Sequence, residues 1–176
     1  EEMIGRLVAF ANSGNWEDLG LDIPEPENLK KAKMLVATNV ARNMSLDMRM
    51  LGEKFGDSED NKASICARTI YDYYVRSNAN RGTQFVFSDL STYKPGEWNI
   101  YSDIKDKLVR LGIPADEIRF IQSVHSEPAR KRLFDDMNAG RVRVLFGSTS
   151  MLGTGVNAQE RAVVIHHLDI PWVPAY

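Results

Sequence analysis

The sequence predicts an α/β protein in which helices flank a mostly parallel β-sheet, preceded by a mainly helical extension. Two observations support this prediction. Short runs rich in β-branched and aromatic residues recur after residue 80, and amphipathic helical segments separate most of them. Strands that alternate with helices are typical of parallel sheets covered on both faces. We expect the strands at 83–88, 118–123, 141–147 and 162–168.

Residues 1–56 form the predicted extension. Its first segment places apolar residues at helical spacing, namely Ile4, Leu7, Val8 and Ala11. This pattern predicts a helix over 1–13, which Gly14 would end. The stretch 34–38 fits either a short strand or the start of a helix that runs toward Met50, and its periodicity leaves both alternatives open.

Residues 57–176 form the predicted sheet domain. Helices are expected over 63–75, 99–111 and 127–139, the last of them stopped by Gly140. The first of these helices offers four residues for burial: Ile65, Ile70, Tyr73 and Tyr74. Ligands of parallel sheets bind at the carboxyl ends of the strands. The residues to test for function therefore follow the strands, at 88–89, 123–126, 147–159 and from 169 onward.

Composition excludes several classes of protein. A chain of 176 residues with 43% apolar and 26% charged residues is typical of a globular domain, not of a disordered tail. No apolar run approaches the ~18 residues that a membrane span requires. The single cysteine, Cys66, excludes an internal disulfide and a cysteine-built metal site. Because the chain has no internal disulfide, we expect a cytoplasmic protein. Because the chain begins at Glu1 and ends abruptly, we expect it to be a piece of a larger polypeptide.

The richest strand end is the segment 147–159, which combines glycines, hydroxyl residues, an asparagine and a glutamine. Glycines let backbone amides approach a phosphate, and hydroxyls add short-range donors. A plain surface loop is the alternative. Residues 153–158 also match the dinucleotide fingerprint G-x-G-x-x-A, but only Val156–Arg161 separate it from the next predicted strand. A crossover helix needs roughly 10–12 residues, so we reject that interpretation.

Other polar groups carry weaker signals. No Walker A pattern occurs in the chain, which excludes a self-sufficient nucleotide hydrolase. The basic run 130–132 with Arg141 and Arg143 is compatible with phosphate contacts, although a solvated surface is the commoner meaning of such a run. A lone histidine such as His125 is more often a structural group than a catalyst.

Taken in order, five segments resemble the C-terminal RecA-like lobe of superfamily 2 helicases and translocases, especially the Swi/Snf-related branch. The resemblance runs from about Asp57 to Pro174. In chain order the segments are the entry pair Asn61-Lys62, the motif IV-like 84–89, the run 118–145 that precedes motif V, the motif V-like 148–159, and 163–174, which is similar to V-I-H-x-D-x-P-W-x-P. The order and spacing of the five carry the resemblance.

The resemblance implies roles for particular residues. In that family a motif V serine or threonine contacts the nucleic-acid backbone, which implies this role for Ser148 and Thr149. The Gly-x-Gly-x-Asn part of motif V faces the ribose of the nucleotide, which implies this role for Gly153, Gly155 and Asn157. A hydroxyl can contact a phosphate without reading bases, and an asparagine amide can both donate to and accept from ribose hydroxyls.

The implied function is that of the second motor lobe of an ATP-dependent DNA helicase or translocase. Ser88, at the end of the motif IV-like segment, and His125 are further expected nucleic-acid contacts. The resemblance implies ATP and Mg²⁺ as cofactors, held mainly by an N-terminal RecA-like lobe of the same polypeptide. Since this chain lacks Walker A, Walker B and the arginines of motif VI, we expect it to hydrolyse no ATP alone. The sequence leaves DNA and RNA both open as the polynucleotide.

A narrower likeness covers 34–50, where Asn43-Met44-Ser45-Leu46-Asp47-Met48-Arg49-Met50 looks like a stretch of large helicase–methylase polypeptides of bacterial mobile elements and phages. It implies a DNA methyltransferase domain as a further partner. Two alternatives stay open. One is a RecA-like module that has lost its nucleotide and docks a partner protein or DNA. The other is an independent enzyme, such as a transferase that pairs His125 with Asp89 or Asp169.

Overall fold

The computed structural model describes residues 1–27, 29–52, 54–152 and 156–170. The chain divides into two compact units, Glu1–Asn61 and Lys62–Tyr176. The predicted boundary lay between residues 56 and 57. Within the described ranges, no helix combines the length and the apolar character that are needed to cross a membrane.

The first unit is helical. Its two long helices are α1 (Glu2–Ser13) and α2 (Leu29–Leu46), and short 3₁₀ turns follow each of them at Trp16–Leu19 and Met48–Leu51. Gly14 ends α1 with a positive φ of 76°, a conformation that glycine adopts without a steric cost. The open choice at 34–38 resolves as helix, because these residues lie inside α2.

The buried face of α1 agrees with the predicted one only in part, because Leu7 and Ala11 pack against the core but Ile4 and Val8 do not. Ile4 and Val8 are 57% and 55% exposed, whereas Phe10 is fully buried. Phe10 meets the ring of Trp16 edge to face at 5.8 Å between centroids. Met3 and Leu7 share the stripe of Phe10 at helical spacing and pack against the same core. The large aromatic side chain therefore sets which face of the helix turns inward.

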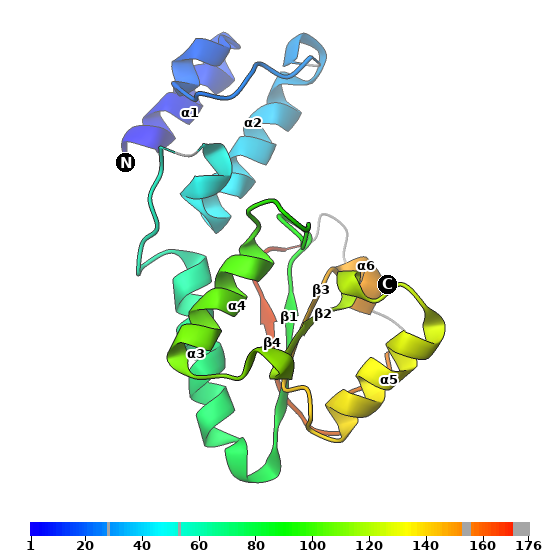
Figure 1. The fold of residues 1–176 in the computed structure, drawn as a ribbon. Coiled ribbons are helices and arrows are strands. Elements are labelled where there is room, and N and C mark those ends of the chain that lie inside the picture. The colour runs from blue at the N-terminus through cyan, green and yellow to red at the C-terminus, as the bar shows by residue number, and fades with distance from the viewer. Residues whose placement is uncertain (28, 53, 153–155, 171–176) are drawn as a thin grey trace. The chain divides into compact units, whose positions relative to one another are not determined.

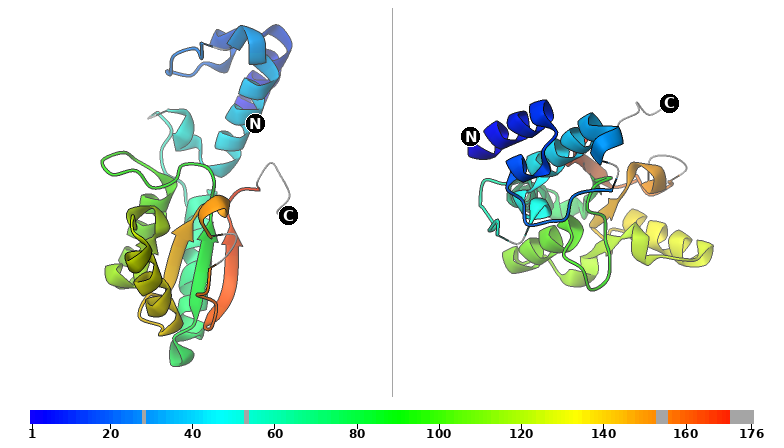
Figure 2. Two further views of the ribbon diagram at one scale, coloured as in Figure 1. Left: turned by 90° about the vertical axis from the view of Figure 1, so that its right-hand side faces the viewer. Right: turned by 90° about the horizontal axis from the view of Figure 1, so that it is seen from above.

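The second unit contains a four-stranded, all-parallel sheet with the order β2-β3-β1-β4. The strands are β1 (Thr83–Phe87), β2 (Ile118–Phe120), β3 (Val144–Gly147) and β4 (Ala162–His167). Figure 2 shows β3, β1 and β4 side by side. The α/β class and the helical N-terminal part confirm the prediction, and the architecture is consistent with a RecA-like fold.

Two strands are shorter than predicted because turns take up their ends. Residues Ile121–Ser123 form a 3₁₀ turn after β2, in which the Val124 amide donates to the Ile121 carbonyl at 3.0 Å. Before β3, the amides of Arg141 and Val142 both donate to the Asp136 carbonyl, at 2.8 and 3.2 Å. These amides complete the end of the preceding helix and so cannot join the sheet ladder.

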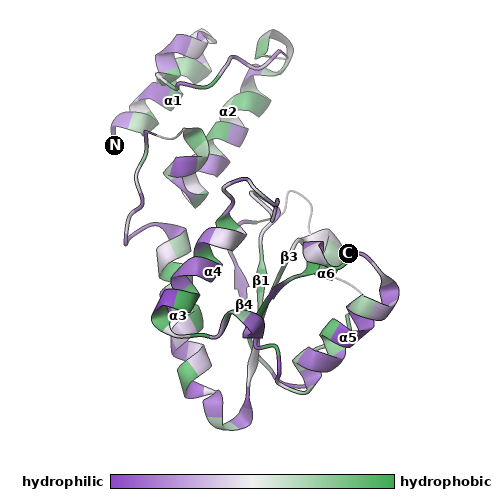
Figure 3. Cartoon of the chain, viewed as in Figure 1, coloured by the Kyte–Doolittle hydropathy of each residue, from purple (hydrophilic) through white to green (hydrophobic). Residues whose placement is uncertain are grey.

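Helices cover both faces of the sheet (Figure 1): α3 (Lys62–Arg76) and α4 (Ile100–Leu111) lie on one side and α5 (Glu127–Asn138) on the other. Phe85, Leu145 and Leu133 share the core on the α5 side. On the opposite side, Tyr101 of α4 packs its ring against those of Phe120 and Phe146. In Figure 3, hydrophobic and hydrophilic residues alternate around α3 and α4, as expected for helices with one buried face.

The inward stripe of α3 consists of small residues and one isoleucine, namely Ala63, Ser64, Cys66, Ala67 and Ile70. Ile70 is buried as predicted, but Ile65 is 47% and Tyr73 36% exposed, which corrects the expected core. Small side chains let the helix pack closely, so the bulkier ones turn outward. Burial raises the pKa of the Cys66 thiol to about 12, which keeps it protonated and unreactive.

Arg143 is fully buried just before β3, at the amino edge of the sheet. Its guanidinium donates to the carbonyls of Gly82 at 2.6 Å and Tyr74 at 2.9 Å, and to the Asn78 Oδ1 atom at 3.0 Å. It also lies 4.1 Å from the centroid of the Tyr74 ring. Tyr74 belongs to the last turn of α3, whose carbonyls lack helical partners. Arg143 is therefore a structural cap and not a phosphate ligand.

We expect Arg143→Met to lower the free energy of unfolding of the second unit by about 3 kcal/mol, because buried carbonyls would lose their donors. Arg141→Met is the matched control: Arg141 is exposed and pairs with Asp136 at 2.6 Å, so its loss should change stability by less than about 0.5 kcal/mol. Urea unfolding followed through the amide signals of β1 measures both. Equal stability of the two variants would contradict the assignment.

A second polar contact joins β4 to β1. The Gln84 amide nitrogen donates to the Ile70 carbonyl at 2.9 Å, so its Oε1 atom accepts from His166 Nε2 at 2.8 Å. Burial lowers the pKa of His166, and neighbouring His167 lowers it further. The fold therefore favours the neutral imidazole.

This contact predicts a pH dependence. Since an unfolded histidine titrates near pH 6.5, the unfolded chain binds a proton at His166 more readily than the folded chain. We expect stability to fall as the pH decreases from 7.5 to 5.5. His166→Gln should flatten this dependence, which urea unfolding at each pH measures. A slope that persists in His166→Gln would refute this prediction.

Candidate nucleic-acid interface

The carboxyl ends of β1, β3 and β4 meet at one edge of the sheet. The Ser88 amide donates to the Gly147 carbonyl at 3.2 Å, and the Leu168 amide donates to the Phe87 carbonyl at 2.9 Å. These bonds extend the parallel ladder by one step beyond the strands. The polar residues that follow the three strands are thereby brought together, although about 20 to 80 positions separate them in the sequence.

Three hydroxyl residues follow β3, and we call Ser148, Thr149 and Ser150 the hydroxyl segment. Ser148 and Thr149 are half-buried and Ser150 is exposed. The Ser148 and Ser150 hydroxyl oxygens lie 3.0 Å apart. The Ser148 carbonyl accepts from the amides of Met151 and Leu152, both at 3.1 Å, which starts the short helix α6 (Thr149–Leu152). The segment therefore presents hydroxyls on a fixed turn.

Two carboxylates hold this turn. The Thr149 amide donates to Asp89 Oδ1 at 2.7 Å. Asp169, after β4, accepts from the Asp89 amide at 3.0 and 3.2 Å and from the Leu90 amide at 2.9 Å. Both carboxylates follow strands that were expected to end at a functional site, and both were candidate partners of a catalytic His125. The structure accounts for them through backbone amides, so the transferase alternative gains no support.

α5 supports the hydroxyl segment from the other side. The Arg130 guanidinium donates to the Met151 carbonyl and lies 5.7 Å from the centroid of the Phe134 ring. A solvated surface was the favoured interpretation of the basic run 130–132, and it is wrong for Arg130, which is half-buried. The sequence carries no local signal for this contact, because Met151 is 21 residues away.

Ser88 is not available to a ligand in this structure, although we predicted it as a nucleic-acid contact. The residue is fully buried, and its hydroxyl donates to the Leu90 carbonyl at 2.9 Å. Its carbonyl accepts from the Tyr101 hydroxyl at 2.6 Å, and burial raises the pKa of that hydroxyl. Ser88 shapes the turn after β1, so we omit it from the proposed interface. His125 is exposed in the loop between the β2 turn and α5.

The expected nucleotide side is different. Gly153 and Gly155 lie outside the described residues. Asn157 is exposed, but its carbonyl accepts from the Asn138 amide at 2.9 Å, and Asn138 is the last residue of α5. The chain continues toward the amino edge, where Arg161 donates to the Asn80 carbonyl at 2.7 Å. Asn157 is therefore tied to the end of α5 through its backbone carbonyl, and its exposed side chain stays a predicted nucleotide contact.

Among the described residues, no group of three or more His, Cys, Asp or Glu side chains could hold a metal ion. No helix follows Val156 before β4, which confirms that the dinucleotide-binding interpretation was rightly rejected. The stretch that was expected to contact both nucleotide and polynucleotide thus presents its hydroxyl segment at the carboxyl edge, while Gly153 and Gly155 lie outside the described residues.

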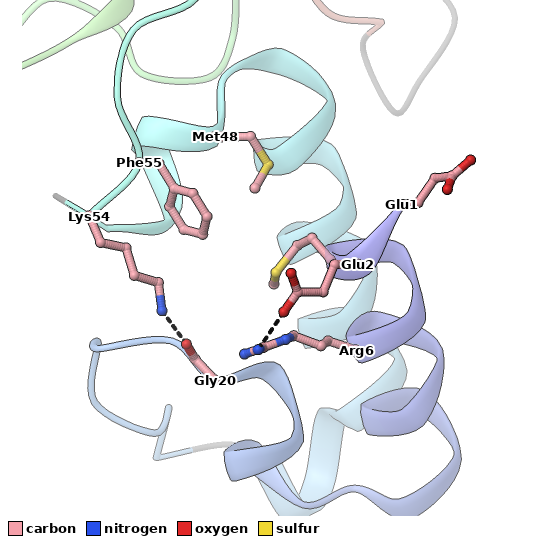
Figure 4. A pocket seen from close by; sticks show the side chains of 8 residues that line it. Glu1, Glu2, Arg6, Gly20, Met48, Lys54 and Phe55 are labelled. Carbon is pink, nitrogen blue, oxygen red and sulfur yellow. Dashed lines mark hydrogen bonds and ion pairs between the residues drawn. The ribbon is translucent and has the colours of Figure 1, made fainter.

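A separate cavity of about 320 Å³ lies within the first unit (Figure 4). Met48 and Phe55 supply apolar walls, and Arg6 and Lys54 supply positive charge. Arg6 pairs with Glu2 at 2.7 Å, and Lys54 donates to the Gly20 carbonyl. Both cations therefore have acceptors within their own unit, and the cavity shares no residue with the predicted site.

A scan against protein-family models found no family that matches this chain. A search of curated proteins likewise found no match.

At Gly147, the end of β3 packs closely against the side chains of Leu152 and Ile121. A Cβ atom there would lie 2.3 Å from Leu152 Cδ1 and 2.8 Å from Ile121 Cγ2. We expect Gly147→Ala to displace α6 and to destabilise the second unit by about 1–3 kcal/mol through overpacking. Gly56→Ala is the control, because nothing lies within 4 Å of the added atom there. Urea titration of both variants against the wild type tests this, and a neutral Gly147→Ala would show that the contact can relax.

Proposed function

We propose that this chain is the C-terminal RecA-like lobe of an ATP-dependent DNA helicase or translocase, and that its hydroxyl segment contacts the nucleic-acid backbone. The observation that supports the proposal most strongly is the meeting of three helicase-like segments at one edge of the sheet. These are the ends of β1, β3 and β4, joined through Asp89 and Asp169. The resemblance placed the same segments in a nucleic-acid-binding lobe.

The chemistry of the edge fits a contact that does not depend on base sequence. Hydroxyls of Ser148, Thr149 and Ser150 can donate to phosphate oxygens, and phosphate contacts position a polynucleotide without reading it. The side chains lie on a turn held by backbone and carboxylate bonds, so little conformational freedom would be lost on binding. His125, exposed beyond β2, is a further candidate contact.

In the proposed whole protein, a second RecA-like lobe supplies most of the contacts to ATP and Mg²⁺. The absence of Walker A in the sequence supports this part of the proposal. A cytoplasmic location and a methyltransferase partner domain belong to the same proposal. The purified chain should accordingly show no ATP turnover above a blank, with or without DNA.

We expect Thr149→Ala and Ser148→Ala each to weaken binding of a single-stranded DNA oligonucleotide by about tenfold, the effect of losing one hydrogen bond to a charged group. Thr69→Ala is the matched control, since this threonine lies on α3 and its hydroxyl donates to the Ile65 carbonyl. NMR titration measures both affinity and the amides that shift.

Wild-type shifts should gather at residues 148–151, weaken with salt as phosphate contacts do, and be as large for RNA if the backbone alone is bound. A titration with no shift at these amides, or with equal affinity in Thr149→Ala and Thr69→Ala, would refute the proposed interface. Shifts at the same amides with a protein partner but not with a polynucleotide would favour the docking-module alternative.

A further inference from the structure

The turn after β1 is held in place by contacts that are remote in sequence. The Asp169 carboxylate accepts from two consecutive amides, those of Asp89 and Leu90. The Ser88 hydroxyl donates to the Leu90 carbonyl, and the next residue, Ser91, has a positive φ of 48°. A non-glycine residue rarely adopts this conformation unless its surroundings impose it. The position of Asp89 is therefore determined by its environment.

The Asp89 side chain then acts on a different strand end. Its carboxylate is exposed, yet it lies 2.7 Å from the Thr149 amide. A single exposed hydrogen bond contributes little by itself, because water competes for both groups. The bond is more stable when its acceptor, the Asp89 carboxylate, is already held in place. Asp169 holds the Asp89 backbone through the Asp89 amide.

We propose that Asp169 and Asp89 are positioning residues that act in series. Asp169 orders the turn after β1, and Asp89 then holds the Thr149 amide and, with it, the hydroxyl segment in the orientation that contacts a phosphate. The last step rests on the proposed function. The first two steps concern the free protein alone.

Simple electrostatics makes the opposite prediction for binding. A carboxylate close to a phosphate repels it, so removing the charge of Asp89 should strengthen binding to a polynucleotide. If Asp89 positions Thr149, removing its acceptor oxygen should weaken binding in spite of the lost repulsion. Asp89→Ala and Asp89→Asn separate the two effects, because asparagine keeps an acceptor oxygen and loses only the charge.

The first arm of the experiment measures amide hydrogen exchange by NMR on the full 176-residue chain without any ligand. We expect Asp89→Ala to speed exchange of the Thr149 amide at least tenfold. Asp169→Ala should speed exchange at Asp89, at Leu90 and also at Thr149, whose amide donates to Asp89. Asp106→Ala, an exposed acid on α4, is the control and should leave all three amides unchanged.

The second arm titrates single-stranded DNA into the same variants. Asp89→Ala should bind several-fold more weakly than wild type, and Asp89→Asn at least as tightly. Faster exchange confined to Asp89 and Leu90 in Asp169→Ala would overturn the action in series. Tighter binding by both Asp89 variants would overturn the positioning role. If wild-type protein binds no DNA, the proposed function fails, and the exchange pattern still decides whether the two carboxylates act in series.

Discussion

The parallel pairing of β1 with both β3 and β4 is the constraint on which the rest of the second unit depends. The central strand β1 is buried along its whole length, and each neighbour starts from a distant part of the sequence. Parallel pairing gives all strands the same direction, so the residues that follow them are delivered to one edge. Without this register, the hydroxyl segment, Asp89 and Asp169 would not lie close together.

The two edges of the sheet use polar residues for different purposes. At the amino edge, Arg143 and Arg161 donate to carbonyls that helices and loops leave without partners. At the carboxyl edge, Asp89 and Asp169 accept from amides that turns leave without partners. Each group satisfies backbone that the sheet cannot reach. Positive charge thus serves stability at the amino edge, while the hydroxyl segment at the carboxyl edge stays partly exposed.

This division changes how the basic residues are interpreted. Arginines close to a helicase-like motif suggest phosphate ligands, but Arg143 is buried at the amino edge and Arg130 holds the Met151 carbonyl of α6. The proposed contact with nucleic acid therefore depends on hydroxyls and a fixed turn more than on local positive charge. In the proposed helicase or translocase, additional positive charge for this contact would come from the other lobe.

The sequence by itself determined the α/β class, the four strands and the helices between them, because hydrophobic periodicity and glycine stops are local properties. It also identified 147–159 as the richest strand end, and the structure places its first part at the carboxyl edge. It could not give the burial of Ser88, the attachment of Asn157 to Asn138 or the contact of Arg130 with α6. Each of these depends on which backbone groups remain unpaired after distant strands have joined, and only the tertiary structure decides that.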